Sequence, residues 1–400
     1  ALTVLAMLAL SWRLPWARLA CAGVGLWVMT APLVFWAPTA AGYLNDTLVG
    51  MLVIGFAALV PPEPGVSPAA ALTGPMAPPG WSFNPSGWTQ RLLIVALALV
   101  GLHISRYLTA YQLGHIDGVW EPFFQGGPDP KNGTEEIITS SVSEAWPVPD
   151  AGLGALTYAL EILTGVIGTR RRWRTMPWLV LLFGLMIAPL GAVSIFFIII
   201  QPIWIGTWCT LCMIAAVAML VQIPYSLDEL VATGQFLLRR RRAGRSLLRV
   251  LFTGDTDEPE RAGGSSNPER EFERSPREIV LDMVGGGVNL PWSLALSITI
   301  GVWLMFTRVT LGAEGGMAHA DHLLGSLIVT VSVIACAEVA RSLRWLNVGL
   351  GLALCVTPFI YAADGLHTVL SLAFGAAVIV LSVPCGRIDG RYGGWERFIR

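Results

Sequence analysis

The chain of 400 residues is 54% hydrophobic and only 13% charged, with a mean hydropathy of +0.62 and a formal net charge of −1. Soluble domains carry about a quarter charged residues, so this composition argues against a soluble globular protein. The near-neutral balance and the lack of any array of basic and aromatic residues give no indication of nucleic-acid binding.

Continuous apolar stretches recur along the chain, and they are long enough to cross a hydrocarbon core of about 30 Å. Backbone groups in that core must bond one another, which leaves helices or a closed barrel, and unbroken apolar stretches lack the alternation of a barrel. The predicted fold class is all-α: a polytopic integral membrane protein with about ten full spans. We expect these spans at residues 17–36, 47–60, 90–113, 151–168, 177–201, 204–223, 290–306, 323–339, 346–361 and 366–383.

Composition divides the chain into six segments. In order they are 1–60, helices of a repeated unit; 61–87, a linker rich in Pro and Gly; 88–232, a bundle of four spans; 233–288, a charged and partly disordered cytosolic linker that includes the polar run at 263–266; 289–385, two further repeat units; and 386–400, a cytosolic tail. The first ten residues are apolar but too few to span and show no cleavable signal peptide. We expect them to be the end of a longer helix.

The first and fifth segments share a repeated pattern. Trp16 and Trp292 each follow a Leu-Pro pair at an expected helix start, and the next Trp lies eleven residues later in both, at Trp27 and Trp303. A third copy starts at Trp345, in which a Gly and a Pro lie seven residues apart as in the first copy. The pattern predicts one two-helix unit that is used repeatedly.

Two acidic residues mark the second helix of this unit. Asp46 and Asp321 lie at corresponding positions before an apolar stretch, and both are expected to be N-cap residues. These units resemble the SPW repeat of bacterial membrane proteins. The resemblance implies a two-helix membrane unit and no defined chemistry.

Arginine clusters set the expected orientation in the membrane. The densest are residues 170–174, between the second and third spans of the bundle, and residues 239–242, after its fourth span. Positive residues favour the cytosolic side, so both clusters are expected there, and the acidic loop at 115–150 is expected outside. We therefore predict a multi-pass protein of the cell membrane.

Cys209 and Cys212 form a CxxC motif at the start of the fourth span of the bundle, near the expected outer face. Residues three apart on a helix have Cβ atoms about 5–6 Å apart, and a modest adjustment would bring them to the roughly 3.5–4.5 Å of a disulfide. The free N–H groups of a helix start stabilise a thiolate, so we favour a redox-active pair over two small packing residues. No second CxxC or histidine pair accompanies the motif, which argues against zinc.

Several further residues of the bundle segment stand in a fixed order with this motif. They are the serine pair at 140–141, the stretch at 148–154, Tyr158, and the stretches at 112–114 and 173–178. Together with the CxxC they resemble bacterial vitamin K epoxide reductase homologues fused to SPW repeats, over residues 84–232. The resemblance implies a four-helix bundle that holds a quinone, menaquinone or ubiquinone, beside Cys212. Cys209 would exchange with the thiol of a periplasmic or extracytoplasmic partner of thioredoxin fold.

The resemblance also assigns roles to single residues. Ser141 matches a serine at the mouth of the family's pocket, and Asp150 falls where vertebrate members bind the quinone through an asparagine. Tyr158 belongs to the same expected set, whereas the tyrosine that follows the CxxC by one turn in vertebrate enzymes is an alanine here. We therefore interpret Cys209, Cys212 and Ser141 as catalytic. Asp150, Cys212 and Tyr158 are interpreted as quinone-binding.

One departure from the family pattern bears on the mechanism. Members usually carry a cysteine pair in the first outer loop, one of them six residues before the serine matched by Ser141. Glu135 occupies that position, and no cysteine lies between Cys21 and Cys209. Either a partner meets Cys209 directly, or the disulfide-forming activity has been lost.

Two ionisable residues lie inside expected spans, where charges are costly and indicate function. Arg106 lies about 9 Å from the outer end of its helix, and Glu161 lies about 15 Å into the next one. They are interpreted either as a structural ion pair or as a proton route for quinone reduction. His319 and His322 supply only two histidine ligands, so no metal site is predicted.

These observations predict a membrane dithiol:quinone oxidoreductase, in which a partner dithiol reduces the CxxC and Cys212 passes two electrons to a quinone. The alternative is a non-catalytic quinone- or lipid-binding membrane scaffold that kept the fold. The intact CxxC argues against that alternative, and the missing loop cysteines argue for it. A transporter is disfavoured because no inverted repeat with broken helices is evident. The expected partners are membrane lipid, quinone and a thioredoxin-fold protein, and not nucleic acid.

Overall fold

The computed structural model describes residues 2–11, 14–59, 63–126, 130–256 and 275–399. Within these residues the regular structure is helical, and strand pairing is limited to isolated bridges. Eight of the described helices are long and apolar enough to cross a membrane. The prediction of an all-α polytopic membrane protein is confirmed.

The membrane-length helices account for eight of the ten expected spans. They are α2 (Pro15–Val34), α3 (Ala40–Leu59), α5 (Trp88–Gln112), α10 (Pro177–Ile200), α11 (Thr210–Arg242), α16 (Gly315–Ile334), α17 (Leu346–Ile360, preceded by the turn η3, Glu338–Trp345) and α18 (Gly365–Ser382). The other two are α8 (Asp150–Val166), with 17 residues, and α14 (Trp292–Met305), with 14. These shorter helices pack along α5 and α16 respectively, so each is part of a bundle wall.

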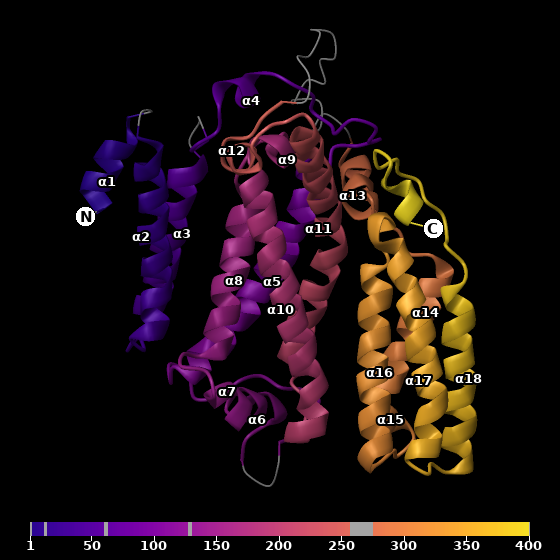
Figure 1. Cartoon of the computed structure of the whole chain (residues 1–400). Coiled ribbons are helices and arrows are strands. Elements are labelled where there is room, and N and C mark those ends of the chain that lie inside the picture. Colours follow the sequence, from indigo (N-terminus) through magenta and orange to yellow (C-terminus); the bar gives the residue numbers. More distant parts are fainter. Residues whose placement is uncertain (1, 12–13, 60–62, 127–129, 257–274, 400) are drawn as a thin grey trace.

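Short elements gather at the two ends of the molecule (Figure 1). The end that carries both arginine clusters, here called the arginine end, holds α4 (Pro68–Leu72), α9 (Arg172–Thr175), α12 (Leu247–Thr253), α13 (Pro276–Gly285) and η4 (Trp395–Phe398). The opposite end, here called the loop end, holds α6 (Gly133–Ile138), α7 (Ser141–Glu144), α15 (Thr307–Thr310) and the π turn η1 (Gln201–Ile205). α1 (Leu2–Ala9) packs against α2.

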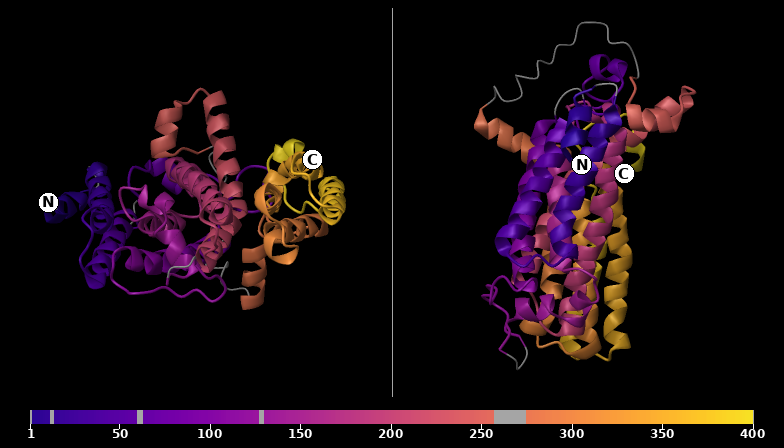
Figure 2. Two further views of the ribbon diagram at one scale, coloured as in Figure 1. Left: turned by 90° about the horizontal axis from the view of Figure 1, so that it is seen from below. Right: turned by 90° about the vertical axis from the view of Figure 1, so that its left-hand side faces the viewer.

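Three groups of helices stand side by side (Figures 1 and 2). The first is α2 with α3, the second is the bundle of α5, α8, α10 and α11, and the third is α14 with α16, α17 and α18. α8 packs against α2 and α3, while α16 packs against α10 and α11. The four-helix bundle is therefore flanked on both sides by repeat units.

The repeat units share one close helix crossing. In each unit two glycines face each other, and a Cβ atom on either one would lie 2.5 to 2.8 Å from the carbonyl oxygen of the other. Such an approach requires glycine, and small residues of this kind let membrane helices pack backbone to backbone. The pairs are Gly25 with Gly50, Gly301 with Gly325, and Gly351 with Gly375.

The expected N-caps at Asp46 and Asp321 are wrong, because the helices begin earlier. α3 begins at Ala40, where the N–H of Gly42 donates to Oγ1 of Thr39 at 3.2 Å, so Asp46 lies more than one turn inside the helix. α16 begins at Gly315, which places Asp321 inside it as well. The repeated aspartate marks equivalent positions within the helix.

The fourth span of the bundle continues through the first part of the expected cytosolic linker. α11 runs for 33 residues to Arg242, and its Glu229 forms a buried ion pair with Arg172 of α9 at 2.6 Å. α9 also packs against α11, so the helix is held at the arginine end by contacts within the bundle. The polar run at 263–266 lies outside the described residues.

The expected linker at 61–87 and the tail at 386–400 pack onto the arginine end. Arg174 donates from Nη1 to the carbonyl oxygen of Ala70 at 2.9 Å, and its side chain is buried. The Trp81 indole donates to Oε1 of Gln235 at 2.9 Å, and Gln235 in turn donates to the carbonyl oxygen of Tyr392 at 2.8 Å. Arg174 of the positive cluster at 170–174 therefore binds the segment after α3 to the arginine end of the bundle.

Candidate functional site

Cys209 and Cys212 form a disulfide at the start of α11, with Cα atoms 5.2 Å apart. Cys209 is the N-cap residue, in extended conformation, and its Sγ accepts the N–H of Cys212 at 3.0 Å. Cys209 is 0% exposed, whereas Cys212 is partly exposed. After reduction, the same N–H and the positive helix end would stabilise a thiolate on Cys209.

The chain approaches the disulfide through an irregular turn. α10 ends in the π turn η1, and Gly206 follows with φ +94, a conformation that favours glycine. Gln201 is buried, and its Oε1 accepts the N–H of Cys209 at 3.1 Å. The sequence predicted a span starting at residue 204, but the turn delays the helix to Thr210, so the CxxC lies on its first turn.

A carboxylate occupies the N-terminus of α11 beside the disulfide. Glu121, from the acidic loop, accepts the N–H of Thr210 at 2.8 Å and its hydroxyl at 2.5 Å. It also accepts the hydroxyl of Thr134 in α6 at 2.7 Å. Burial alone would raise the pKa of the Glu121 carboxyl, but these hydrogen bonds outweigh that effect and its pKa is lowered. Glu121 therefore ties the loop to the start of α11.

Helix α6 covers the buried sulfur of Cys209. A Cβ atom on Gly133 would lie 2.5 Å from the carbonyl oxygen of Trp208, so the two backbones touch. Ile137 and Ile138 pack in the same apolar cluster as Cys209. The fully buried sulfur of Cys209 therefore lies in a cluster to which α6 contributes two side chains.

Glu135, which stands where the family carries a loop cysteine, has a structural role. It completes a capping box with Asn132 at the start of α6, because each side chain accepts the backbone N–H of the other. Its other oxygen accepts the N–H of Val119 at 3.0 Å. The position is therefore used to fold the loop that covers the disulfide.

The repeat unit that follows the bundle completes the wall around the disulfide. Trp208, which directly precedes Cys209, contacts Phe124 of the loop at a ring distance of 5.3 Å. It also contacts Phe306 at 5.9 Å and His322 at 6.5 Å, both from the repeat unit. The residue before the start of α11 therefore packs between the acidic loop and the repeat unit of α14 to α16.

A polar network closes the loop end of α5 and α8. Oδ1 of Asp150 accepts the side-chain amide of Gln112 at 2.5 Å and lies 2.8 Å from the hydroxyl of Ser143. Ala151, the next residue, packs against the cluster that contains the two cysteines. Ser141 is exposed at the start of α7, and its hydroxyl has no hydrogen bond among the described residues. Ser143, by contrast, is buried and contacts Asp150.

Tyr158 joins α8 to the helix that carries the CxxC. It is buried, its ring lies against Gly101 of α5, and its hydroxyl donates to the carbonyl oxygen of Ala215 at 2.9 Å. Ala215 lies three residues after Cys212, so this hydroxyl is about one turn from the disulfide.

Residues 92–227 match the model of the vitamin K epoxide reductase family, and residues 291–384 match the SPW repeat domain. The chain contains a vitamin K epoxide reductase family domain fused to an SPW repeat domain. No curated protein and no solved structure matches the chain. The bundle of α5, α8, α10 and α11 is thus the vitamin K epoxide reductase domain, and the group of α14 to α18 is the SPW domain.

Arg106 and Glu161, interpreted above as either a structural ion pair or a proton route, do not form an ion pair among the described residues. The ring of Tyr158 lies level with Gly101, so Glu161 lies about one turn nearer the arginine end and Arg106 more than one turn nearer the loop end. The separation along the helices is roughly 12 Å. Glu161 is buried beside Gln222, and Arg106 lies over the ring of Tyr43 at 6.0 Å.

The structure thus brings together only part of the expected site. Cys209, Cys212 and Asp150 lie at the loop end of the vitamin K epoxide reductase domain, and Tyr158 reaches the CxxC helix from the middle of α8. Ser141 is exposed at the same end, and Ser141, Arg106 and Glu161 are not part of the cluster that holds the two cysteines. The residues that support the motif were not predicted from the sequence. These are Glu121, Gln201, Trp208 and Ser143. The only sequence signal was the acidic character of the loop that holds Glu121.

Proposed function

We propose that the vitamin K epoxide reductase domain passes electrons from a partner dithiol through Cys209 and Cys212 to a membrane quinone, menaquinone or ubiquinone. The family supports a membrane redox function related to quinones. The observation that carries the finer proposal is the closed CxxC at the start of α11, with an apolar cluster against it. Ile104, Leu108 and Leu211 belong to this cluster, and such surroundings suit an apolar ring.

Each half of the proposed reaction moves two electrons. A thiolate of the partner attacks the disulfide and forms a mixed disulfide, and the second partner thiol resolves it. This leaves both cysteines reduced and the partner oxidised. The two cysteines then close their disulfide again, and the two electrons and two protons convert the quinone to its hydroquinone.

Access to Cys209 must involve the loop. Because the chain has no cysteine in that loop, we propose that the partner meets the CxxC directly at Cys209. α6 covers this sulfur, so its contact with Trp208 must open before exchange. The hydrogen bonds of Glu121 and the capping box of Glu135 hold the closed position.

Three side chains are proposed to line the quinone site. Asp150 has one oxygen engaged by Gln112, and an ionised carboxylate accepts but cannot donate, so its other oxygen suits the hydroxyl of a hydroquinone. Ser143, whose hydroxyl lies 2.8 Å from Oδ1 of Asp150, is proposed to line the site in place of Ser141, which the resemblance put at the mouth of the pocket. Tyr158 brings a hydroxyl to within one turn of Cys212, close to Ala216, where vertebrate members carry a tyrosine.

Glu161 remains a candidate proton carrier without Arg106. Its carboxyl is buried in α8, next to Gln222 of the CxxC helix and on the arginine side of Tyr158. We propose that this carboxyl supplies a proton during quinone reduction. The arginine end is proposed to face the cytosol of a cell membrane and the loop end to face outside, by the positive-inside rule.

The test uses the purified full-length chain with dithiothreitol and a soluble quinone analogue. The wild type is expected to reduce the quinone, and Cys212→Ser is expected to abolish the reaction. Cys336→Ser is the matched control, because Cys336 is a buried lone cysteine of the SPW domain. Cys212→Ser should also trap a partner on Cys209 in membranes, detected by mass spectrometry, and Cys209→Ser should not.

The second candidate is a non-catalytic scaffold that binds quinone or lipid. The observation that favours it is the absence of loop cysteines together with the full burial of Cys209. Quinone binding without reduction, and no trapped partner in Cys212→Ser, would support the scaffold over the oxidoreductase.

A further inference from the structure

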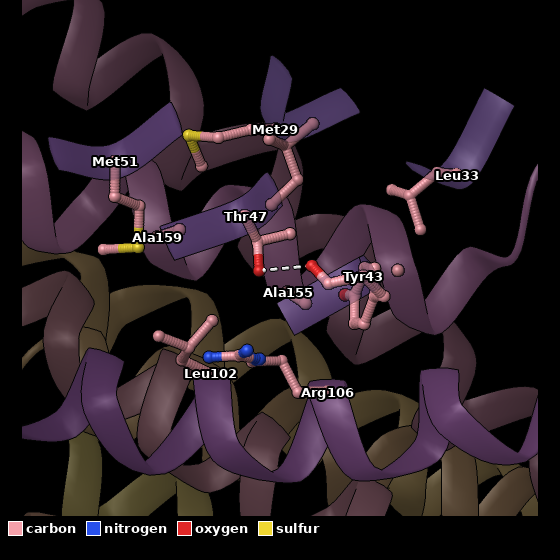
Figure 3. Close-up of a pocket in the computed structure, with 11 residues that line it drawn as sticks. Met29, Leu33, Tyr43, Thr47, Met51, Leu102, Arg106, Ala155 and Ala159 are labelled. Carbon is pink, nitrogen blue, oxygen red and sulfur yellow. Dashed lines mark hydrogen bonds between the residues drawn. The ribbon is translucent and has the colours of Figure 1, made fainter. Parts of the chain in front are cut away.

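A pocket lies between the first helix pair and the vitamin K epoxide reductase domain. It is partly open to the surroundings and is lined from α2, α3, α5 and α8 (Figure 3). Its walls are apolar on most sides, with Met29, Leu33, Leu102 and Ala159 among them. The disulfide does not line it, so the pocket is separate from the proposed quinone site.

Arg106 is the only charged residue that lines this pocket. Figure 3 shows its side chain extending toward Leu102, with Thr47 and Tyr43 on the opposite side of the drawn space. Its Nε is buried and has no hydrogen-bond partner, and no carboxylate pairs with it among the described residues. The hydroxyl of Thr47 already donates to the carbonyl oxygen of Tyr43 at 2.8 Å. The guanidinium lies over the ring of Tyr43, 6.0 Å from its centre.

An arginine inside a membrane is costly without a counter-charge. A neutral acceptor would satisfy a hydrogen bond but would leave the charge uncompensated in an apolar pocket. A phosphate group carries the charge and also matches the planar fork of donors on a guanidinium. The apolar walls beside Met29 and Leu33 suit an acyl chain.

We propose that this pocket binds an anionic phospholipid from the leaflet at the loop end, with its phosphate on Arg106. Arg106 lies six residues before the end of α5, which is about 9 Å along the helix. A long arginine side chain can bridge part of such a depth toward the headgroup layer. The lipid would fill the seam between α2–α3 and α5–α8, and so would join the first repeat unit to the redox domain.

The experiment measures lipid binding to the purified, delipidated full-length chain by native mass spectrometry. The probes are phosphatidylglycerol and phosphatidylcholine with the same acyl chains. The wild type should retain phosphatidylglycerol in preference to phosphatidylcholine, and Arg106→Gln should weaken phosphatidylglycerol binding about tenfold. Ala159→Leu, which fills the pocket and keeps the charge, should weaken it as well.

Arg18→Gln is the matched control, because Arg18 lies near the other end of α2 and donates to the carbonyl oxygen of Ala57 at 2.8 Å. It should bind phosphatidylglycerol like the wild type. Size-exclusion chromatography reports whether each variant is folded. If Arg106→Gln does not fold, phosphatidylglycerol binding is measured on Ala159→Leu and Arg106→Lys in its place.

Four results would overturn the proposal. One is equal binding of phosphatidylglycerol to the wild type and to the folded pocket variants, and another is equal binding of the two lipids. A third is displacement of phosphatidylglycerol by inorganic phosphate alone, which would assign the site to a free anion. The fourth is its displacement by a soluble quinone, which would assign the pocket to a neutral ring. None of these results depends on whether the CxxC reduces a quinone, so the two proposals fail separately.

Discussion

Replacing Glu121 by alanine is expected to loosen the loop that covers Cys209. The Glu121 carboxylate is the common acceptor for the hydroxyl of Thr134 in α6 and for the N–H and hydroxyl of Thr210 in α11. Without it, α6 loses a polar link to the CxxC helix, and the N–H of Thr210 loses its acceptor at the helix start.

The size of the effect follows from these bonds. Because Glu121 is partly exposed, we count one hydrogen bond to a charged group and part of a helix cap, together about 2–3 kcal/mol. If α6 must open before a reagent reaches Cys209, this energy increases the open population and the labelling rate roughly 30- to 150-fold. Glu121→Gln keeps the shape and loses the charge, so about 1 kcal/mol and an increase of about fivefold are expected.

The assay is alkylation of Cys209 in the Cys212→Ser protein, followed by mass spectrometry. Cys336, which is buried in the SPW domain, serves as the internal control for global unfolding. An unchanged rate at Cys209 in Glu121→Ala would refute the idea that this carboxylate holds the loop. Equal acceleration at Cys336 would refute local opening, since the variant would then unfold the whole protein.

Three further predictions use the same protein. The pKa of Glu121 is lowered in the folded state, so its stabilising effect is complete above the ordinary value of 4.5 and is lost as the pH falls through the folded value. The labelling rate of Cys209 relative to that of free cysteine at the same pH should therefore rise only below about pH 4.5, and Glu121→Gln should lack this rise. Glu229→Gln should destabilise the protein by roughly 3–5 kcal/mol, because it leaves the buried Arg172 without a counter-charge; an unchanged thermal melt would contradict this. Phe306→Ala should speed labelling of Cys209 through loss of its contact with Trp208, and no change would show that the SPW domain does not support the site.

Local sequence patterns predicted the membrane helices well, because an apolar stretch of membrane length leaves the backbone few alternatives. The CxxC was also placed correctly at a helix start, although Gly206 and the π turn moved that start to Thr210. The repeat pattern marked equivalent positions. It misplaced the caps at Asp46 and Asp321, since a helix can begin earlier wherever no residue stops it.

The supports of the site could not be read from the sequence, because they join distant segments. Glu121 and Thr210 are 89 positions apart, and the contact of Trp208 with Phe306 joins two domains. The same limit misled the interpretation of charge. Arg106 and Glu161 lie in the neighbouring helices α5 and α8, but at different heights along the bundle axis. A sequence does not give the register in which two helices pack.

The contact of Trp208 with Phe306 and His322 has a consequence for how this protein can be divided. A fragment cut after α11 would keep every residue matched to the vitamin K epoxide reductase family, yet it would lose one side of the indole next to Cys209. That face of the indole would then lose the two rings that cover it. The SPW domain therefore forms part of the surroundings of the CxxC and is more than a flexibly attached neighbour. The two domains must be expressed, exchanged and varied as one unit.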